Sequence, residues 1–83
     1  MSARTVLVTG ATSGIGHAIA ELFAEAGWRL QLLARRSDRL SELSARLREE
    51  RGVEVETWTL DVRDRASVEA WAAENAQSLG RTD

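Results

Sequence analysis

The sequence predicts an α/β protein with the element order β-α-β-α-β-α, in which helices cover a sheet of parallel strands. Three apolar or alternating segments, at residues 6–8, 30–33 and 53–60, have the lengths and patterns of strands. Each is followed by apolar residues at helical spacing, and a glycine ends each helical stretch. Alternation of this kind implies parallel strands joined by right-handed crossovers.

The first predicted strand and helix are joined by a turn rich in small residues. Residues 6–8 form a continuous apolar run, which is typical of a parallel strand covered on both faces. Beyond the turn at residues 9–14, five apolar residues are expected to share the apolar face of the first helix: Ile15, Ile19, Leu22, Phe23 and Ala26. Gly27 is expected to follow the end of this helix.

The second strand and helix follow directly. Residues 30–33 form an apolar run that Gln31 interrupts only weakly. Ser37 is the expected N-cap of the second helix, with Asp38 in its first turn. Three leucines form the apolar stripe of this helix, and a glycine ends it: Leu40, Leu43, Leu47 and Gly52.

The third strand alternates between apolar and charged residues. Glu54 and Glu56 alternate with valines along residues 53–60, a pattern that favours an edge strand. Asp64 or Ser67 is expected to open the third helix. Four residues mark the stripe of this helix before its closing glycine: Val68, Trp71, Ala72, Leu79 and Gly80. The three tryptophans are interpreted as packing residues because no basic stripe accompanies them.

The composition limits the kind of protein that this chain can be. Its 83 residues include no cysteine and one histidine, His17, which excludes disulfides and argues against a zinc site. The net charge of −2, with both signs well mixed, argues against a nucleic-acid partner. There is no signal-peptide pattern and no apolar run of about 20 residues, the length that spans a bilayer. We expect residues 1–83 to form one unit of a cytoplasmic protein, with His17 exposed.

The strongest functional signal is the glycine-rich turn between the first strand and the first helix. Gly10 allows a sharp turn, Gly14 lets the backbone approach a bound pyrophosphate, and Gly16 lets helix and strand pack closely. The free N–H groups at the helix start, aided by the helix dipole, can hold the phosphates. The spacing also fits a tight turn with no ligand, and it departs from the common Gly-x-Gly-x-x-Gly fingerprint.

This turn, TGATSGIG at residues 9–16, resembles the signature of the short-chain dehydrogenases/reductases. A second match is the segment LDV at residues 60–62, at the end of the third strand. The resemblance covers the whole chain and implies the first βαβαβα part of a Rossmann fold, a doubly wound parallel sheet with the strand order 3-2-1. It assigns Asp61 to the adenine amino group and the backbone N–H of Val62 to the adenine ring, although Asp61 also suits a simple strand-end turn.

The end of the second strand predicts which cofactor is preferred. Ala34 stands where NAD-specific enzymes usually carry an acidic residue for the ribose 2′-OH. Without that carboxylate, Arg35 and Arg36 can bind a 2′-phosphate through charge-assisted hydrogen bonds. In NADP-dependent members of the resembled family an arginine often follows this strand, which corresponds to Arg35; otherwise both arginines are solvated surface residues. The predicted NADP site comprises Gly10, Thr12, Ser13, Gly14, Ile15, Gly16, Arg35, Arg36, Asp61 and Val62.

The catalytic residues of the resembled family have no counterpart in these 83 residues. The family uses a Tyr-x-x-x-Lys pattern for acid/base chemistry, a serine that positions the substrate, and an Asn-Asn-Ala-Gly segment after the fourth strand. The chain has no tyrosine and no lysine, and Asn75 is its only asparagine. Ser13 and Ser67 are not substitutes, because one lies in the turn and the other starts a helix. We therefore predict no catalytic and no metal-binding residues in this chain.

Two functions stay open from the sequence. The first is the NADP-binding half of an oxidoreductase that transfers hydride between NADP(H) and an alcohol or carbonyl substrate. The segments LARR and DVRDR, at residues 33–36 and 61–65, resemble the branch that acts on small 3-hydroxy acids. The second is a non-catalytic nucleotide-binding module, or a structural fragment that a partner completes.

The resemblance also implies an incomplete sheet, because the pattern calls for a fourth strand that these residues do not contain. Residues 6–8, which lie at the centre of the full family sheet, would then form an exposed apolar edge. The first two helices would share one face of the sheet, and the third helix alone would cover the other. We expect this chain to self-associate through that edge.

Overall fold

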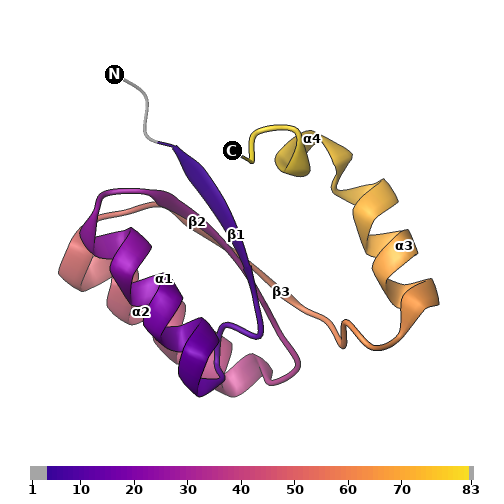
Figure 1. Ribbon diagram of the computed structural model, residues 1–83, viewed down its shortest axis with the longest axis horizontal. Helices are drawn as coiled ribbons and strands as arrows, with labels where there is room; N and C mark the ends of the chain where they lie inside the picture. The colour runs from indigo at the N-terminus through magenta and orange to yellow at the C-terminus, as the bar shows by residue number, and fades with distance from the viewer. Residues whose placement is uncertain (1–3, 83) are drawn as a thin grey trace.

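The computed structural model describes residues 4–82 and has the predicted parallel sheet. The strands β1 (Thr5–Thr9), β2 (Arg29–Ala34) and β3 (Val55–Thr59) form one sheet in the order β1-β2-β3, and both neighbouring pairs are parallel (Figure 1). β2 lies in the middle, and every residue of it after the first is buried. β1 is therefore an edge strand, as the strand order 3-2-1 predicts.

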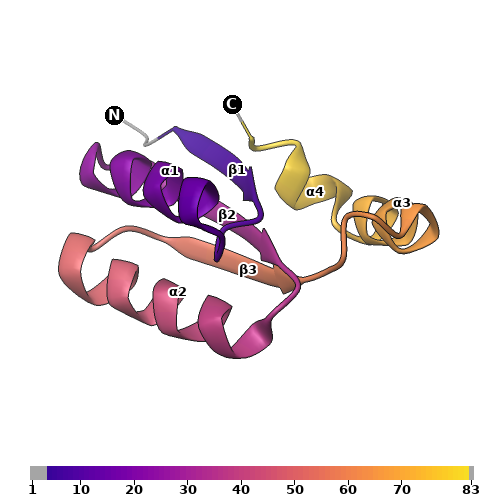
Figure 2. The ribbon, with the colours of Figure 1, turned by 60° about the horizontal axis from the view of Figure 1, so that its bottom comes forward.

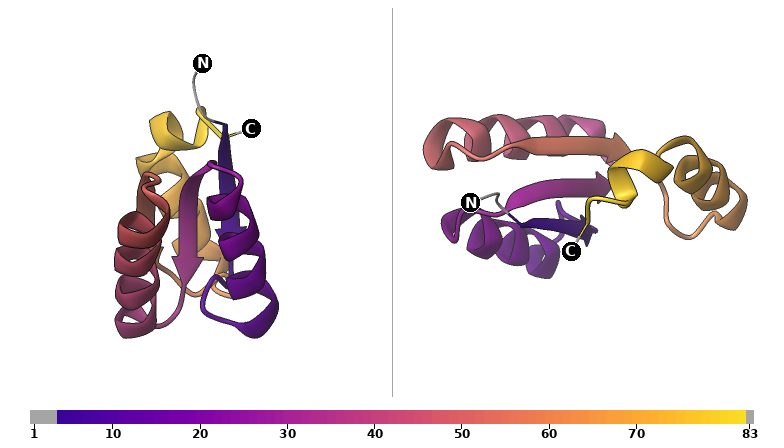
Figure 3. Two further views of the ribbon diagram at one scale, coloured as in Figure 1. Left: turned by 90° about the vertical axis from the view of Figure 1, so that its left-hand side faces the viewer. Right: turned by 90° about the horizontal axis from the view of Figure 1, so that it is seen from above.

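Two helices cover one face of this sheet, as predicted. α1 (Gly14–Glu25) follows β1 and α2 (Ser37–Arg51) follows β2. Figure 2 and the left view of Figure 3 show them side by side on the same side of the strands. Successive right-handed crossovers in one direction produce this arrangement. The core between the helices and the sheet contains Val8, Ala20, Ala24, Leu30, Leu32, Leu40, Leu43, Leu47 and Val55.

The face of α1 that packs on the core differs from the predicted one. Gly16, Ala20 and Ala24 are buried, and of the predicted face only Phe23 packs partly against the core. Four apolar residues of that predicted face are exposed: Ile15, Ile19, Leu22 and Ala26. Small residues one turn apart let the helix approach the sheet closely, and this close approach decides which face is buried. The apolar stripe Ile15, Ile19 and Leu22 is therefore left on the surface.

α2 has the predicted apolar stripe, because its three leucines are all buried. The helix begins one residue earlier than predicted: Ser37 is its first residue, and Arg36 stands at the N-cap without a side-chain capping bond. At the other end, Gly52 has a φ of +66°, and its N–H donates to the Arg48 carbonyl oxygen at 3.1 Å. Left-handed glycine is a common helix ending because it lacks a Cβ.

The third helical segment begins at the predicted cap. Asp64 caps α3 (Arg65–Glu74), and its Oδ1 accepts a hydrogen bond from the Ser67 backbone N–H at 3.2 Å. The segment is interrupted at Asn75 and continues as the short helix α4 (Ala76–Leu79). None of the helices in residues 4–82 is both long and apolar enough to cross a membrane.

The second face of the sheet is covered thinly. α3 and α4 lie on the side opposite α1 and α2 (Figure 1), and neither contains a buried residue. Trp71 of α3 packs edge-on against Trp58 of β3, with ring centroids 5.4 Å apart. Near α4, the buried Gln31 donates through Nε2 to the Ser78 carbonyl oxygen at 2.7 Å. The polar residue that interrupts the second apolar run is thus satisfied by the last turn of the described chain.

Candidate functional site

The glycine-rich turn is held in place by backbone hydrogen bonds. Gly10 has a φ of +64°, a conformation that glycine adopts without steric cost. The Ala11 N–H donates to the Leu33 carbonyl oxygen at 3.0 Å, which attaches the turn to the end of β2. The N–H and the Oγ of Ser13 both donate to the Gly10 carbonyl oxygen, at 3.0 and 2.7 Å. These hydrogen bonds hold the turn in one conformation.

Gly14 and Gly16 meet opposite surroundings. A Cβ on Gly16 would lie 2.0 Å from the Gly10 carbonyl oxygen, so only glycine fits between the helix and the turn. A Cβ on Gly14 would meet nothing within 4 Å, because its surroundings are open. One glycine permits close internal packing, and the other leaves space for a ligand to approach the backbone.

The start of α1 offers free hydrogen-bond donors. Its first helical bond runs from the His17 N–H to the Ser13 carbonyl oxygen at 2.7 Å. The N–H groups of Gly14, Ile15 and Gly16 therefore have no acceptor within the helix. The first turn contains no acidic residue, so the positive end of the helix dipole is not neutralised there. These donors suit an anionic group such as a pyrophosphate.

A cleft of about 450 Å³ opens at the carboxyl ends of the three strands. It gathers predicted residues from three separate segments of the chain: Gly10, Thr12 and Ser13 from the turn, Arg35 and Arg36 after β2, and Asp61 and Val62 after β3. The predicted Gly14, Ile15 and Gly16 lie in the first turn of α1, beside this cleft. In open α/β sheets, ligands bind at this end of the strands.

The lining of the cleft is strongly basic. Four arginines line it, Arg35, Arg36, Arg39 and Arg63, and Asp61 is the acidic residue among the lining side chains. Ala34, at the end of β2, is buried and places no carboxylate there. The cleft can therefore accept a phosphate group without an opposing negative charge at the strand end.

Arg63 is one of two charged lining residues that were not among the predicted site residues. Its Nε and Nη2 donate to the two carboxylate oxygens of Asp61, both at 3.1 Å. Its backbone N–H donates to Asp61 Oδ1 at 3.0 Å as well. These bonds, the side-chain bonds above all, lower the pKa of Asp61 from 3.8 to about 2. Asp61 is therefore ionised at neutral pH and retains capacity to accept a further hydrogen bond.

Arg39 is the other residue that sequence reasoning missed. It lies in the first turn of α2, three residues after Arg36, and one helical turn brings such residues to the same side. This spacing is the signal that could have revealed it, once Ser37 is recognised as the first helical residue. In residues 4–82, no hydrogen bond or ion pair is formed by the side chain of Arg39 or Arg35, whereas Arg36 pairs with Asp38 at 3.6 Å.

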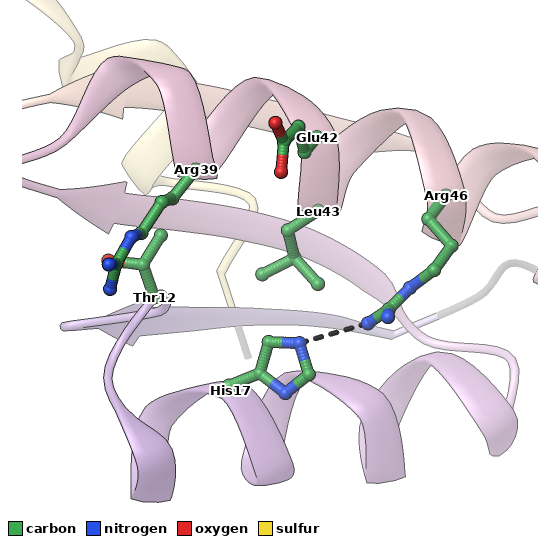
Figure 4. A pocket seen from close by; sticks show the side chains of 6 residues that line it. All are labelled: Thr12, His17, Arg39, Glu42, Leu43 and Arg46. Carbon is green, nitrogen blue, oxygen red and sulfur yellow. Dashed lines mark hydrogen bonds between the residues drawn. The ribbon is translucent and has the colours of Figure 1, made fainter.

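A second cavity of about 370 Å³ lies beside the cleft, between α1 and α2. Figure 4 shows Arg39 reaching toward Thr12, and both of these residues line the cleft as well. His17, which was expected to be exposed, is half-buried and faces α2. Arg46 donates to His17 Nε2 at 2.9 Å and also hydrogen-bonds Glu21. The close packing of α1 against α2 explains why the histidine is partly covered.

Comparison with known proteins identifies the family. The sequence model described as short chain dehydrogenase matches residues 4–83. The chain belongs to the short-chain dehydrogenase family. It is 47% identical over 76 residues to sulfoacetaldehyde reductase 2 of Chromohalobacter salexigens, covering 92% of this chain and 29% of that protein. It is 46% identical over 77 residues to a granaticin polyketide synthase putative ketoacyl reductase of Streptomyces violaceoruber, covering 93% of this chain and 28% of that protein.

Solved structures of this short-chain dehydrogenase family share the fold. An alcohol dehydrogenase from Thermococcus sibiricus, complexed with 5-hydroxy-NADP, superposes with a TM-score of 0.89 at 39% identity, over 99% of this chain and 35% of that one. L-sorbose reductase from Gluconobacter frateurii, complexed with NADPH and L-sorbose, has a TM-score of 0.87 at 40% identity, over 99% and 31% of the two chains. The chain thus spans about a third of the length of these relatives.

Proposed function

We propose that residues 1–83 are the NADP-binding, N-terminal part of a Rossmann domain in an oxidoreductase. The enzyme transfers hydride between NADP(H) and an alcohol or carbonyl substrate. One observation carries this proposal: a single basic cleft at the carboxyl ends of the strands joins the glycine turn, the arginines after β2 and the LDV segment after β3. The NADP and NADPH complexes of the solved relatives support the choice of cofactor.

Each part of the cleft is suited to one part of the cofactor. The free N–H groups of Gly14, Ile15 and Gly16 receive the pyrophosphate, and the open space at Gly14 lets it approach. Thr12 and Ser13 shape the turn beside it. The ionised Asp61 and the backbone of Val62 contact the adenine, and the arginines after β2 bind the 2′-phosphate. NADP(H) supplies or accepts the hydride, while this chain binds and orients its adenosine end.

The substrate is not encoded in this cleft. Among relatives, one is named for sulfoacetaldehyde, one for a ketoacyl group and one was solved with L-sorbose, so their names favour no single carbonyl compound. The small 3-hydroxy-acid branch therefore stays a prediction, as does the cytoplasm as location. Because the chain has no tyrosine and no lysine, the acid/base step of the resembled family has no residue here to perform it.

The second candidate is a nucleotide-binding module without catalysis, and the same cleft would serve it. The mass of the native protein distinguishes the two candidates. If the native protein is heavier than these 83 residues, the result supports the oxidoreductase. If its mass equals that of the 83 residues, the result supports the module.

Titration of the purified chain with NADPH and with NADH tests the proposal. We expect NADPH to bind more tightly, and Gly14→Val to abolish binding of both because the new side chain occupies the open space before the turn. Ala18→Val is the matched control, since it adds the same side chain at an exposed position of the same helix. Equal affinity for the two cofactors, or a folded chain that binds neither, would contradict the assignment.

The same sample is expected to catalyse no NADP-linked oxidation of an alcohol, because it lacks a general acid/base of the family kind. Absorbance at the nicotinamide band measures the rate. Turnover that rises in proportion to the chain concentration, and that Gly14→Val abolishes, would show that other residues perform the proton transfer.

A further inference from the structure

His17 lies at the contact between α1 and α2, in the wall of the cavity beside the cleft (Figure 4). Its ring Nε2 lies 2.9 Å from Nη2 of Arg46 on α2, and 3.9 Å from Oε1 of Glu21, one turn further along α1. The same Nη2 of Arg46 also donates to Glu21 Oε1. We propose that His17 is a proton-operated switch. Its neutral ring holds Arg46 as a bridge between the two helices, whereas its protonated ring pairs with Glu21 and releases Arg46.

The donor on α2 determines which form of the His17 ring fits the bridge. A guanidinium group has only N–H donors, so Arg46 requires an acceptor at His17 Nε2. A neutral imidazole accepts at one ring nitrogen and donates at the other, which places its proton on Nδ1. A proton added at Nε2 removes the acceptor and sets two positive groups against each other. Protonation of the ring and the hydrogen bond from Arg46 therefore exclude each other.

Glu21 gives the protonated ring another partner within α1. Residues four apart on a helix lie on the same side, where opposite charges attract each other. The distance of 3.9 Å between His17 Nε2 and Glu21 Oε1 is already that of an ion pair. Because the same Oε1 accepts from Arg46, the new pair competes with the second bond of the bridge. A contact between two helices is thereby exchanged for a contact within one helix.

The bridge from Arg46 is balanced closely enough for one proton to change it. Both of its bonds leave from Nη2, whereas Nε is buried without a hydrogen-bond partner among the described residues. An unsatisfied buried N–H group costs free energy, and this cost offsets part of the stabilisation by the bridge. His17, Glu21 and Arg46 are only partly buried, so water can solvate each charge after the exchange.

The other groups that face His17 across the cavity come from the glycine turn and from α2. Thr12 carries no charge, and Arg39 and Glu42 carry opposite charges in the same lining. Thr12 and Arg39 line the cleft as well, so the switch lies directly beside the candidate binding site. None of its groups requires a bound cofactor, and the inference therefore stands independently of the proposed function.

Nuclear magnetic resonance of the unaltered chain follows both partners of the switch. His17 is the one histidine of the chain, so the imidazole signals belong to it alone. From about pH 8 to about pH 5.5, a histidine gains its proton while carboxylates stay ionised. Over this range we expect the Arg46 Nε–H signal to move along the same curve as the His17 ring signals. Arg48, which is also on α2 but donates to the Val55 carbonyl oxygen, is the control whose signal should stay in place.

A double-mutant cycle measures whether the bridge itself is lost. Urea unfolding of the unaltered chain, His17→Ala, Arg46→Ala and the double variant gives the coupling free energy between the two side chains. We expect favourable coupling at about pH 8 and its loss at about pH 5.5. Arg51→Ala, at the exposed far end of α2, is the matched control for Arg46→Ala and should show no coupling to His17 at either pH.

His17→Gln separates the acceptor from the proton. Its new amide oxygen can accept from Arg46 but does not titrate. In a chain that carries His17→Gln, adding Arg46→Ala should therefore lower the free energy of unfolding equally at the two pH values. In the unaltered chain, Arg46→Ala should lower it more at about pH 8 than at about pH 5.5.

Three results would each overturn the switch. The first is an Arg46 signal that does not follow the His17 ring. The second is a coupling between His17 and Arg46 that is equal at both pH values. The third is an effect of Arg46→Ala that depends on pH in the same way when His17→Gln is present, because the dependence would then arise from another group. The proposed NADP cleft is tested separately, by the titrations with the two cofactors.

Discussion

At the scale of single residues, we expect the preference for NADP to depend on Arg35, the residue that directly follows β2. Arg35→Asp, combined with Arg36→Ala, should weaken NADPH binding by about 10- to 150-fold, because a charge-assisted hydrogen bond contributes roughly 1.5–3 kcal/mol. The new carboxylate would repel the 2′-phosphate and can accept a hydrogen bond from the 2′-OH of NAD. The preference for NADPH should therefore narrow or reverse. Calorimetric titration with both cofactors measures it, and an undiminished preference would exclude Arg35 from the site.

The ion pair between Asp61 and Arg63 predicts the pH range in which the Asp61 carboxyl group titrates, and the Asp61 Cγ signal can follow this titration. The bonds from Arg63 lower the pKa of Asp61 from 3.8 to about 2 in the folded chain. A carboxyl group with a lowered folded pKa stabilises the fold above the unfolded value, and this contribution is lost as pH falls from 3.8 through about 2. The Cγ signal of Asp61 should therefore titrate near the lower value. Arg63→Ala should raise the Asp61 pKa toward 3.8 while leaving that of Asp64, which Ser67 lowers, in place.

At the scale of elements, the junction of β1 and α1 contains two glycines with separable roles. Gly16→Ala places a Cβ 2.0 Å from the Gly10 carbonyl oxygen, and backbone atoms cannot yield cheaply. We expect it to lower the free energy of unfolding by about 1–3 kcal/mol, the usual cost of overpacking. Gly14→Ala meets open space, so it should not destabilise the chain, yet it should weaken cofactor binding. Urea unfolding measures the stability of both variants, and titration with NADPH measures their cofactor binding. Equal free energies of unfolding for Gly16→Ala and Gly14→Ala would contradict the separate roles of the two glycines.

At the scale of the whole molecule, two surfaces lack cover in the described chain. β1 is an edge strand that pairs with one neighbouring strand only, and Ile15, Ile19 and Leu22 expose an apolar stripe on α1. We expect a dimer or larger species at micromolar concentration, measured by light scattering. Antiparallel pairing of two β1 edges is the arrangement that a two-fold axis allows. A compact monomer with a sharp, concentration-independent thermal transition would show that the edge is covered in another way.

Much of this molecule could be predicted from local sequence patterns. The alternation of strand and helix signals predicts the element order, and the TGATSGIG and LDV segments predict the family and the three segments that meet at the cleft. Strand length, helix caps and the glycine turn depend on neighbours within a few residues, so they can be recognised in a single sequence. The exact helix start at Ser37 was missed by one residue because Arg36 takes the cap position without a capping side chain.

The features that depend on contacts between residues far apart in the sequence were decided only by the tertiary structure. Hydrophobic periodicity predicted the wrong face of α1, because the clearance at Gly16 and the two alanines, and not the largest side chains, set how the helix meets the sheet. The same packing of α1 against α2 leaves the His17 side chain half-buried beside Arg46. Arg39 and Arg63 joined the cleft because their helix and loop bring them there, although neither was among the predicted cofactor-binding residues. By itself the sequence determined the elements and the family, whereas long-range packing, which no local pattern encodes, determined the exposed faces and the partners of each arginine.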